Sequence, residues 1–424
     1  MDKLIIKGGQ RLEGSVTASG AKNAVLPILA ATLLTDEKCC IENVPELRDV
    51  RTMVKILEGL GVNISFEDGI IEVEAGGFSG YQASYELVRT MRASICVLGP
   101  LLSRKGEASV SLPGGCIIGS RPIDLHLKGF RAMGAEIEVE HGYINAKADT
   151  LSGARIYLGG PSGSSVLATA NVMLAAILAK GETYIESAAC EPEILDLAEF
   201  LNKMGAKVEG AGTPMVKIEG VDKLCGATHS VIPDRIEAGT YLVAGVLTKG
   251  DVLVKNARVQ DLGAVLNALD AIGAEIIYQP AGIRVKGRDV INPADITTLP
   301  YPGFPTDMQA QFMSLLSIAN GVSVITEKVF PERFMQIGEL NRMGADITLE
   351  GATAIIKGVE HLSGSEVMAS DLRASAALVL AGLIADGETV ISRVYHIDRG
   401  YERLVEKLKT LGARIERVQE CKIL

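Results

Sequence analysis

The stretch RAMGAEIEV (131–139) joins the end of a helix, a glycine and the start of a strand. Gly134 fits the residue that follows a helix C-terminus with left-handed backbone angles, because glycine has no Cβ to clash there. In the strand that follows, the apolar Ile137 and Val139 alternate with glutamates. This alternation predicts a strand with one buried face and one solvent-facing side. The stretch decides the fold because it recurs along the chain.

The helix–glycine–strand pattern occurs six times. The copies are LEGLGVNI (57–64), RAMGAEIEV (131–139), LNKMGAKVE (201–209), LDAIGAEII (269–277), LNRMGADIT (340–348) and KLKTLGARI (407–415). Their glycines are at positions 61, 134, 205, 273, 344 and 412, so successive copies are 73, 71, 68, 71 and 68 residues apart. Such a period is too long for an ordinary solenoid repeat, so each unit must hold several elements.

Between these copies lie six helices of small and apolar residues. We expect them at 24–34, 93–102, 167–179, 238–248, 309–319 and 374–385. Several are apolar nearly all round, which indicates burial on every side. Helices inside and sheets outside is the inverse of a TIM barrel. The sequence therefore predicts an α/β fold of two inside-out α/β barrel domains, each with three pseudo-symmetric repeats of buried helices and outer sheets.

Composition narrows the class of protein. A chain of 424 residues is expected to form two or three domains, and 47% hydrophobic with 22% charged residues is typical of a soluble globular protein. The net charge of −10 offers no basic field for nucleic acid. The apolar runs 172–179 and 374–385 are shorter than the roughly 20 residues of a membrane span, and MDKLIIKGG at the start has no signal-peptide apolar region.

Seven cysteines are scattered along the chain without a CxxC pair or a Cys/His cluster. This pattern favours a reducing compartment and disfavours structural zinc. We expect a cytoplasmic protein that binds neither membranes nor nucleic acid and that needs no metal. A monomer is the default expectation.

The stretch LPGGCIIGSRPID (112–124) carries a candidate reactive thiol. Gly114 and Gly115 precede Cys116 and remove side chains from its approach, and Arg121 follows five residues later. A guanidinium near a thiol on such a loop indicates a cysteine whose proton can be tuned. The alternative is a tight turn with an inert, half-buried cysteine. Spacing alone does not favour either interpretation.

Polar residues also gather at the starts of the buried helices. They are Lys22, Asn23, Arg92, Ser164, Ser165, Asp234, Arg235, Asp307, Asp371 and Arg373. Helix N-termini favour anions, and N-capping alone explains Ser164, Asp307 and Asp371. Cations at helix starts are disfavoured unless a negative group is nearby. Lys22, Arg92 and Arg373 therefore suggest an anionic ligand between the two domains.

Seven motifs together resemble one enzyme family. They are SGAKNAVLP (19–27), TMRAS (90–94), LPGGCIIGSRPIDLH (112–126), PDRIEAGT (233–240), FPTDMQAQ (304–311), SDLRASAALVLAG (370–382) and YHIDRGYERL (395–404). In this order they resemble the UDP-N-acetylglucosamine 1-carboxyvinyltransferases, which are enolpyruvyl transferases, over essentially the whole chain. The resemblance implies two inside-out barrels: an N-terminal domain of residues 22–232 with the Cys116 loop, and a C-terminal domain of residues 1–21 plus 233–424. The active site would lie in the cleft between them.

The resemblance implies transfer of enolpyruvyl from phosphoenolpyruvate to the 3′-hydroxyl of UDP-N-acetylglucosamine, with release of phosphate. In this family the reaction is the first committed step of peptidoglycan synthesis and proceeds by addition and elimination through a tetrahedral intermediate. No metal or organic cofactor is implied. The epoxide phosphonate fosfomycin alkylates the loop cysteine in this family.

Residue roles follow from the resemblance position by position. Cys116 corresponds to the general acid, and Asp307 to the base that takes the proton of the sugar hydroxyl. Lys22, Arg121 and Arg399 correspond to cations that bind phosphate and carboxylate, with Arg373 nearby. Asn23 corresponds to a hydrogen-bond partner of the sugar hydroxyl or the intermediate. The other expected substrate-binding residues are Arg92, Arg121, Pro122, Ile123, Asp124, Leu125, Ser165, Val166, Val329, Asp371 and Arg373.

Two segments depart from the family pattern. GGPSGSSVLAT (159–169) is longer than usual, lacks a preceding lysine and has Leu167 where glycine is usual, and Cys190 occupies a position that is commonly basic. Both lie in the domain expected to hold the nucleotide.

Two other functions stay open. A 5-enolpyruvylshikimate-3-phosphate synthase-like transferase would share the architecture but lacks the PGGC loop. An inactive paralogue that binds UDP-sugars and regulates wall synthesis is disfavoured by the presence of Cys116, Asp307, Lys22 and Arg399. A phosphate-release assay with both substrates separates these possibilities.

Overall fold

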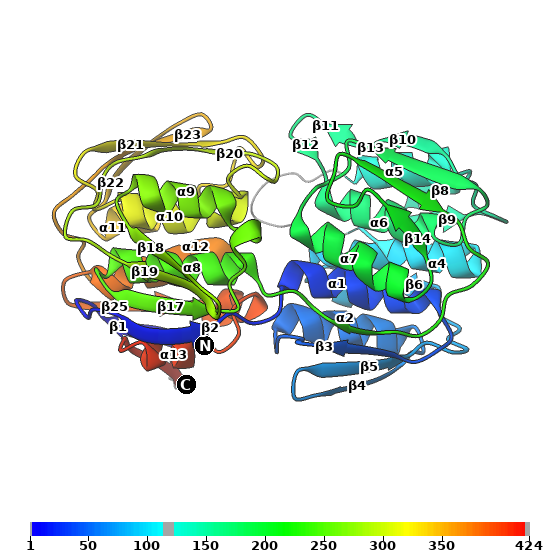
Figure 1. Cartoon of the computed structure of the whole chain (residues 1–424), viewed down its shortest axis with the longest axis horizontal. Helices are drawn as coiled ribbons and strands as arrows, with labels where there is room; N and C mark the ends of the chain where they lie inside the picture. The colour runs from blue at the N-terminus through cyan, green and yellow to red at the C-terminus, as the bar shows by residue number, and fades with distance from the viewer. Residues whose placement is uncertain (1, 113–122, 420–424) are drawn as a thin grey trace. The chain divides into compact units, whose positions relative to one another are not determined.

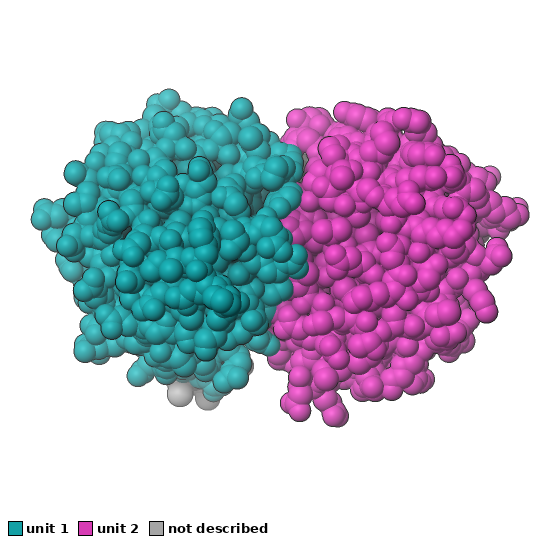
Figure 2. Space-filling model, in the orientation of Figure 1, with its two compact units in different colours: residues 1–19, 117–119, 233–424 teal, residues 20–116, 120–232 magenta. Residues whose placement is uncertain are grey.

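The computed structural model describes residues 2–112 and 123–419. Within these ranges the chain divides into two compact units, shown in different colours in Figure 2. Unit 1 contains residues 2–19 and 233–419, and unit 2 contains residues 20–112 and 123–232. Each unit has its own hydrophobic core.

Buried helices form the interior of each unit (Figure 1). Those of unit 2 are α1 (Lys22–Ala31), α4 (Leu98–Lys105) and α6 (Val166–Ala176), and those of unit 1 are α8 (Arg235–Leu247), α10 (Gln309–Leu316) and α12 (Leu372–Ile384). In α8, every residue after Arg235 is buried. The six expected apolar helices are therefore confirmed.

Some helix boundaries differ from expectation. The helices expected at 167–179 and 309–319 end at Ala176 and Leu316, and the helix expected at 238–248 begins at Arg235. The segment expected at 24–34 ends in a 3₁₀ turn, η1 (Thr32–Leu34). The segment expected at 93–102 is divided into η2 (Arg92–Val97) and α4. Pro100, the third residue of α4, has no N–H and fits the first turn of an α-helix, where that N–H would have no partner within the helix. The start of α4 at Leu98 suits this position.

A second set of helices precedes the recurring glycines. They are α2 (Arg48–Gly59), α5 (Asp124–Ala132), α7 (Pro192–Lys203), α9 (Gly263–Ala271), α11 (Ile337–Arg342) and α13 (Leu404–Thr410). The φ angles of the six glycines lie between 94° and 99°. The predicted left-handed residue after each helix is confirmed. Shorter helical turns are α3 (Tyr85–Val88), η3 (Val259–Asp261), η4 (Thr306–Met308) and η5 (Val394–Arg399).

Each unit also contains three four-stranded sheets. The strand orders in unit 2 are β16 (Thr228–Ser230), β3 (Cys39–Glu42), β5 (Ile70–Glu74), β4 (Asn63–Glu67); β6 (Gln82–Ala83), β7 (Glu107–Ser111), β9 (Tyr143–Lys147), β8 (Glu136–Glu140); and β10 (Arg155–Tyr157), β13 (Glu182–Glu186), β15 (Met215–Glu219), β14 (Lys207–Glu209). A separate small hairpin pairs β11 (Gly159–Gly160) with β12 (Gly163–Ser164).

The strand orders in unit 1 are β18 (Glu275–Gln279), β19 (Gly282–Lys286), β17 (Asp251–Lys255), β2 (Glu13–Thr17); β20 (Asp295–Thr298), β21 (Val322–Glu327), β23 (Thr353–Lys357), β22 (Asp346–Glu350); and β24 (Glu366–Met368), β25 (Glu388–Ser392), β1 (Asp2–Lys7), β26 (Arg414–Gln419). Each sheet combines one parallel strand pair with antiparallel neighbours. Figure 1 shows the sheets around the helices α8, α10 and α12.

The N-terminal strands complete two sheets of unit 1. Strand β1 lies between β25 and β26 and is antiparallel to both, whereas β2 pairs in parallel with β17. The chain leaves unit 1 after Ser19, whose carbonyl accepts a 2.7 Å hydrogen bond from the N–H of Asp234. Residues 2–19 therefore belong to unit 1 because its sheets need their backbone groups.

The alternation expected in the strand of the first quoted stretch is only partly confirmed. In β8, Ile137 is half-buried, but Val139, which was expected to be buried on the same side of the strand, is 46% exposed. Strand β8 lies at an edge of its sheet, where it pairs on one side with β9. The more central β5 follows the expected pattern, with Ile71 and Val73 buried.

A close helix contact in unit 2 gives a test of the packing. A Cβ added at Gly99 in α4 would lie 2.3 Å from the backbone oxygen of Asn171 in α6. We expect Gly99→Ala to lower the free energy of unfolding by about 1–3 kcal/mol, the usual cost of overpacking. Gly59→Ala in α2 is the control, since nothing lies within 4 Å of its added Cβ, and we expect it to be neutral or stabilising by up to about 1 kcal/mol. Urea melts of both variants measure the difference, and equal effects would contradict the close contact.

Candidate active site

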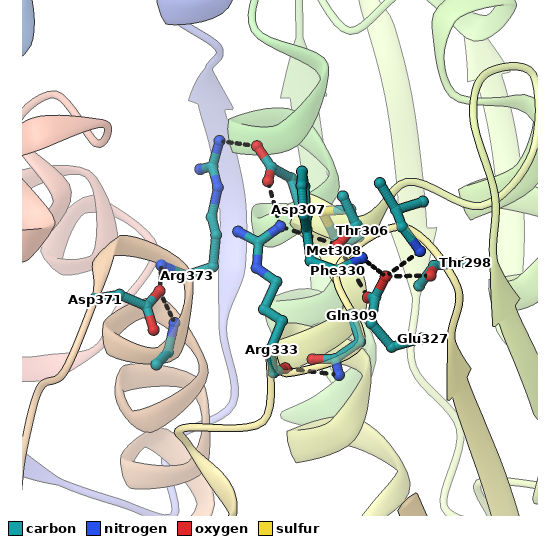
Figure 3. Close-up of polar contacts among 12 residues, drawn as sticks. Thr298, Thr306, Asp307, Met308, Gln309, Glu327, Phe330, Arg333, Asp371 and Arg373 are labelled. Atoms are coloured by element: carbon teal, nitrogen blue, oxygen red, sulfur yellow. Dashed lines mark hydrogen bonds and ion pairs between the residues drawn. The ribbon is translucent and has the colours of Figure 1, made fainter. Parts of the chain in front are cut away.

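Asp307 lies between two guanidinium groups in unit 1 (Figure 3). Arg333 Nη1 donates to Asp307 Oδ1 at 2.7 Å, and Arg373 Nη2 donates to Asp307 Oδ2 at 2.9 Å. The side chains of Arg333 and Arg373 are 5% and 2% exposed, whereas that of Asp307 is 25% exposed. The carboxylate thus borders solvent while the two cations that hold it are buried.

This arrangement keeps Asp307 ionised. Burial acts to raise the pKa of Asp307, but Arg373 and Arg333 outweigh it and hold the pKa well below its usual range. The charge of Asp307 in turn raises the pKa of Arg373, against the effect of burial. Asp307 caps no helix, since η4 and α10 have no side-chain cap. The capping explanation from the sequence is therefore wrong for this residue.

Two buried glutamines fix the backbone around Asp307. Gln311 Nε2 donates to the carbonyl of Asp307 at 2.9 Å, and Gln309 Nε2 donates to the carbonyl of Arg333 at 3.1 Å. Gln336 in turn donates to Gln309 Oε1 at 2.8 Å. All three glutamines are at most 1% exposed. The backbone of the acid and of one guanidinium partner is therefore rigidly held.

Asp371 is the N-cap of α12. Its Oδ1 accepts hydrogen bonds from the N–H groups of Arg373 and Ala374 at 2.8 and 3.1 Å. The capping explanation is confirmed here. The cap orients the start of α12 and with it Arg373, whose Nε and Nη1 are buried and make no hydrogen bond within the described part of the chain.

The other two residues expected in unit 1 lie in turns. Val329 follows β21, and its N–H donates to Glu327 Oε1 at 2.8 Å. Arg399 is the last residue of η5 and is half-buried.

In unit 2, Lys22 is the first residue of α1 and is paired with a carboxylate. Its Nζ lies 2.7 Å from Asp49 Oδ2, and the two side chains are 11% and 3% exposed. Asn23 is the next residue and is half-buried. The negative groups near Lys22 and Arg373 thus come from the chain itself. Their positions at helix starts do not by themselves require an anionic ligand, which corrects the argument from the sequence.

Arg92 begins η2 and influences a buried histidine, His126 in α5. Burial, with a smaller contribution from Arg92, lowers the pKa of His126 to about 3. His126 is therefore neutral, and its Nδ1 lies 3.1 Å from Asn171 Nδ2. Since the amide can only donate there, Nδ1 accepts and the ring proton is on Nε2.

The remaining expected residues of unit 2 lie at two helix starts. Ile123 precedes α5, which begins with the exposed Asp124 and the half-buried Leu125. Ser165 is the N-cap of α6, and its side chain accepts from the N–H of Ala168 at 3.3 Å. Val166 is the first residue of that helix. The expected residues Cys116, Arg121 and Pro122 lie outside the described residues.

Sequence reasoning missed four residues that the structure brings to these sites. They are Asp49, Glu327, Arg333 and His126. Asp49 looked like an ordinary acidic residue in a first helical turn. His126 ends one of the quoted motifs, which was an available signal. Glu327 and Arg333 carry no signal in the sequence, because only their burial and pairing distinguish them from surface charges.

Known proteins are similar to this chain along nearly its whole length. The family model for EPSP synthase (3-phosphoshikimate 1-carboxyvinyltransferase) matches residues 6–408. The UDP-N-acetylglucosamine 1-carboxyvinyltransferase of Desulfosudis oleivorans is 56% identical over 418 residues, covering 99% of this chain and 100% of that protein. The protein of the same name from Geotalea uraniireducens is 55% identical over 420 residues, with the same coverage. The chain belongs to the UDP-N-acetylglucosamine 1-carboxyvinyltransferase family.

Solved structures agree with this membership. The enolpyruvyl transferase NikO from Streptomyces tendae is 26% identical, has a TM-score of 0.89 and covers 98% of each chain. EPSP synthase from Acinetobacter baumannii is 20% identical with a TM-score of 0.76, which shows a shared fold. The α/β class expected for this member of the 1-carboxyvinyltransferase family is confirmed.

Among residues 2–112 and 123–419, no group of three His, Cys, Asp or Glu side chains could hold a metal ion. No helix within those ranges has both the length and the apolar character to cross a membrane.

The pairing of Asp307 predicts an acid-dependent stability. The pKa of aspartate in the unfolded state is about 3.9, and the pKa of Asp307 in the folded state is lower. The ion pairs therefore stabilise the fold above about pH 4, and this stabilisation is lost as the pH falls through the folded-state pKa. We expect Asp307→Asn to be less stable than wild type at pH 6, with a difference that shrinks below about pH 4. Urea melts between pH 2 and 7 measure it. Asp289→Asn is the control, because that side chain is 91% exposed. A difference in the free energy of unfolding between wild type and Asp307→Asn that stays the same at every pH would contradict the pairing.

Proposed function

We propose that the protein transfers the enolpyruvyl group of phosphoenolpyruvate to the 3′-hydroxyl of UDP-N-acetylglucosamine, with release of phosphate, as the first committed step of peptidoglycan synthesis. The observation that carries this proposal is the 52–56% identity, over nearly the whole chain, to proteins named UDP-N-acetylglucosamine 1-carboxyvinyltransferase. The arrangement around Asp307 and Lys22 supports it, because buried cations near ionised carboxylates suit a substrate with phosphate and carboxylate groups.

In this proposal Asp307 removes the proton of the sugar hydroxyl as oxygen attacks C2 of phosphoenolpyruvate. Cys116 protonates the methylene carbon, so that C2 carries both the sugar oxygen and the phosphate in a tetrahedral intermediate. Loss of phosphate and of one methyl proton then restores the double bond. The carboxylate is ionised at neutral pH, as a base must be, but two guanidinium contacts make it a weak base.

Arg373 offers a way to strengthen that base. Its buried Nε and Nη1 have no hydrogen-bond partner within the described residues, so a shift of the guanidinium toward a substrate anion would give partners to donors that now have none. A substrate phosphate or carboxylate that draws Arg373 away from Asp307 would remove part of the charge that stabilises the carboxylate. Asp307 would then become more basic when the substrate is bound.

The remaining roles follow the family. Lys22 and Arg399 would hold the charged groups of phosphoenolpyruvate, together with Arg121, and Asn23 would bind the sugar hydroxyl. The contacts to the UDP-sugar are proposed for Arg92, Arg121, Pro122, Ile123, Asp124, Leu125, Ser165, Val166, Val329, Asp371 and Arg373.

The proposal includes the domain organisation. We take residues 22–232, and residues 1–21 with 233–424, as two inside-out α/β barrels that both contribute to one active site. Three four-stranded sheets and three buried helices in each compact unit support this interpretation. A cytoplasmic location and a monomeric state remain predictions from the sequence.

Phosphate release tests the function directly. We expect wild type to release phosphate from phosphoenolpyruvate only when UDP-N-acetylglucosamine is present, and not with shikimate 3-phosphate. Asp307→Ala should lower kcat by about 10²-fold or more, the range for loss of a general base. Asp307→Asn is the second variant, because it keeps the volume of the side chain, and a urea melt checks that each variant is folded. Binding of the UDP-sugar without phosphate release by wild type would favour a regulatory paralogue instead.

Fosfomycin tests the role of Cys116. The sulfur of Cys116 should attack a ring carbon of the epoxide, which forms a C–S bond, breaks one C–O bond and leaves the oxygen as a hydroxyl after it takes a proton. This reaction should be faster with the UDP-sugar bound. We expect peptide mass mapping to find the added mass at Cys116, while Cys116→Asp keeps turnover and resists the compound. Cys116→Ser should be severely impaired, because a hydroxyl is far less acidic than a thiol. A label at Cys39, Cys40 or Cys225, or full activity of Cys116→Ser, would show that the loop cysteine is only structural.

A further inference from the structure

Glu327 is a buried carboxylate that has no part in the proposed chemistry. It ends β21, is 1% exposed and accepts four hydrogen bonds. Its Oε1 accepts from Thr298 Oγ1 at 2.6 Å and from the N–H groups of Val329 and Phe330 at 2.8 and 2.9 Å, and its Oε2 accepts from Thr306 Oγ1 at 2.9 Å. Two backbone N–H groups and two hydroxyls as donors suit an ionised carboxylate, which only accepts.

The contact with Thr306 fixes the direction of a hydroxyl group. Because Thr306 Oγ1 donates its single proton to Glu327, it presents lone pairs on its other side. Arg333 Nη1 donates to one of them at 3.0 Å, and the same nitrogen donates to Asp307 Oδ1 at 2.7 Å. Figure 3 shows Thr306 and Asp307 on one side of the Arg333 guanidinium, with Glu327 beyond Thr306.

Arg333 depends on these acceptors for its position. Its side chain is 5% exposed, so a guanidinium without partners there would be costly. The backbone of Arg333 is held by Gln309, but its charged end is held by Asp307 and Thr306. Thr306 precedes Asp307 in the chain, so Arg333 Nη1 donates hydrogen bonds to two adjacent residues. The two contacts together determine where the guanidinium lies relative to the carboxylate.

We propose that Thr306, oriented by Glu327, is a positioning residue that fixes Arg333 against Asp307 and thereby sets the orientation of the Asp307 carboxylate for proton transfer. This inference rests on the proposed function, in which Asp307 is the base. Glu327 acts through Thr306 and touches no substrate.

The alternative is that Glu327 only fastens the turn 328–330. Thr298 separates the two possibilities, because its hydroxyl also donates to Glu327. Thr298 in β20 is the direct pairing partner of Glu327 in β21. Thr298 further accepts from the N–H of Lys328 at 3.0 Å. Thr298 therefore serves the turn, whereas Thr306 is the hydroxyl that reaches Arg333.

Matched valine variants form the experiment. Thr306→Val and Thr298→Val each remove one hydroxyl bond to Glu327 and keep the branched shape of the side chain. We expect Thr306→Val to lower kcat by about 10- to 100-fold, the order of loss from a misplaced catalytic group. Thr306→Ser should restore kcat toward wild type, because it keeps the hydroxyl. Thr298→Val should change KM for the UDP-sugar, through the turn that carries Val329, more than it changes kcat.

The pH profile adds a readout that a purely structural role would not move. In Thr306→Val, Arg333 holds Asp307 less firmly, so the acid limb of kcat should shift to higher pH. Arg373, with Asp234 and Tyr401 near it, is the other charged neighbour and is the same in both valine variants. Thr298→Val should keep the wild-type limb. Equal losses of kcat with unchanged limbs in both variants would overturn the inference.

A stability measurement separates this inference from the proposed function. If wild type releases no phosphate with either acceptor, the proposed function fails and kinetics cannot be used. Urea melts from pH 2 to 7 then test the positioning role. If Arg333 is held less firmly against Asp307, protonation of Asp307 destabilises the fold at a higher pH. We expect that onset at higher pH in Thr306→Val than in wild type and Thr298→Val. The same onset in all three proteins would overturn the positioning role.

Discussion

The carboxylate of Asp307 is held by the buried guanidinium groups of Arg333 and Arg373, and the arrangement of this part of unit 1 depends on that interaction. Two buried cations a few ångströms from one carboxylate are acceptable because its charge offsets part of theirs and because hydrogen bonds hold the backbone around them. Gln311 and Gln309 hold the main chain, and Asp371 caps the helix that carries Arg373. These contacts hold the backbone of the site in place without a ligand, which reduces the ordering that binding must supply.

The same interaction sets a conflict between stability and chemistry. Ion pairing stabilises the ionised form of Asp307, and for the same reason it makes the carboxylate a weaker base. A base that is held this way gains strength only if one of its partners is drawn off. The spare buried donors of Arg373 make it the better candidate, whereas Arg333 is held on a second side by Thr306. Lys22 and Asp49 form a similar buried ion pair in unit 2, where a carboxylate of the chain neutralises the lysine.

Several features could be predicted from particular residues. The glycines at 61, 134, 205, 273, 344 and 412 indicated left-handed residues after helices, and all six have positive φ. The apolar stretches indicated buried helices, because a helix without a polar face has no side to turn to water. Val139 shows the limit of this reasoning: alternation predicted burial, but β8 is an edge strand and Val139 is exposed. Whether a strand is central or at an edge depends on its neighbours, which no local pattern contains.

The sequence by itself determined the repeat, the α/β class and the family, because each depends on residue types at fixed spacing or on similarity along the whole chain. It also identified Asp307 and Arg373 as candidates, through motifs that lie 66 residues apart. Only the tertiary structure decided that these two residues form an ion pair and that Asp371 caps a helix. Only the structure brought Glu327, Thr306 and Arg333 to the same carboxylate. The physical reason is that burial and hydrogen bonding arise between segments distant in sequence, and a charged residue looks the same in the sequence whether it is solvated or held in place.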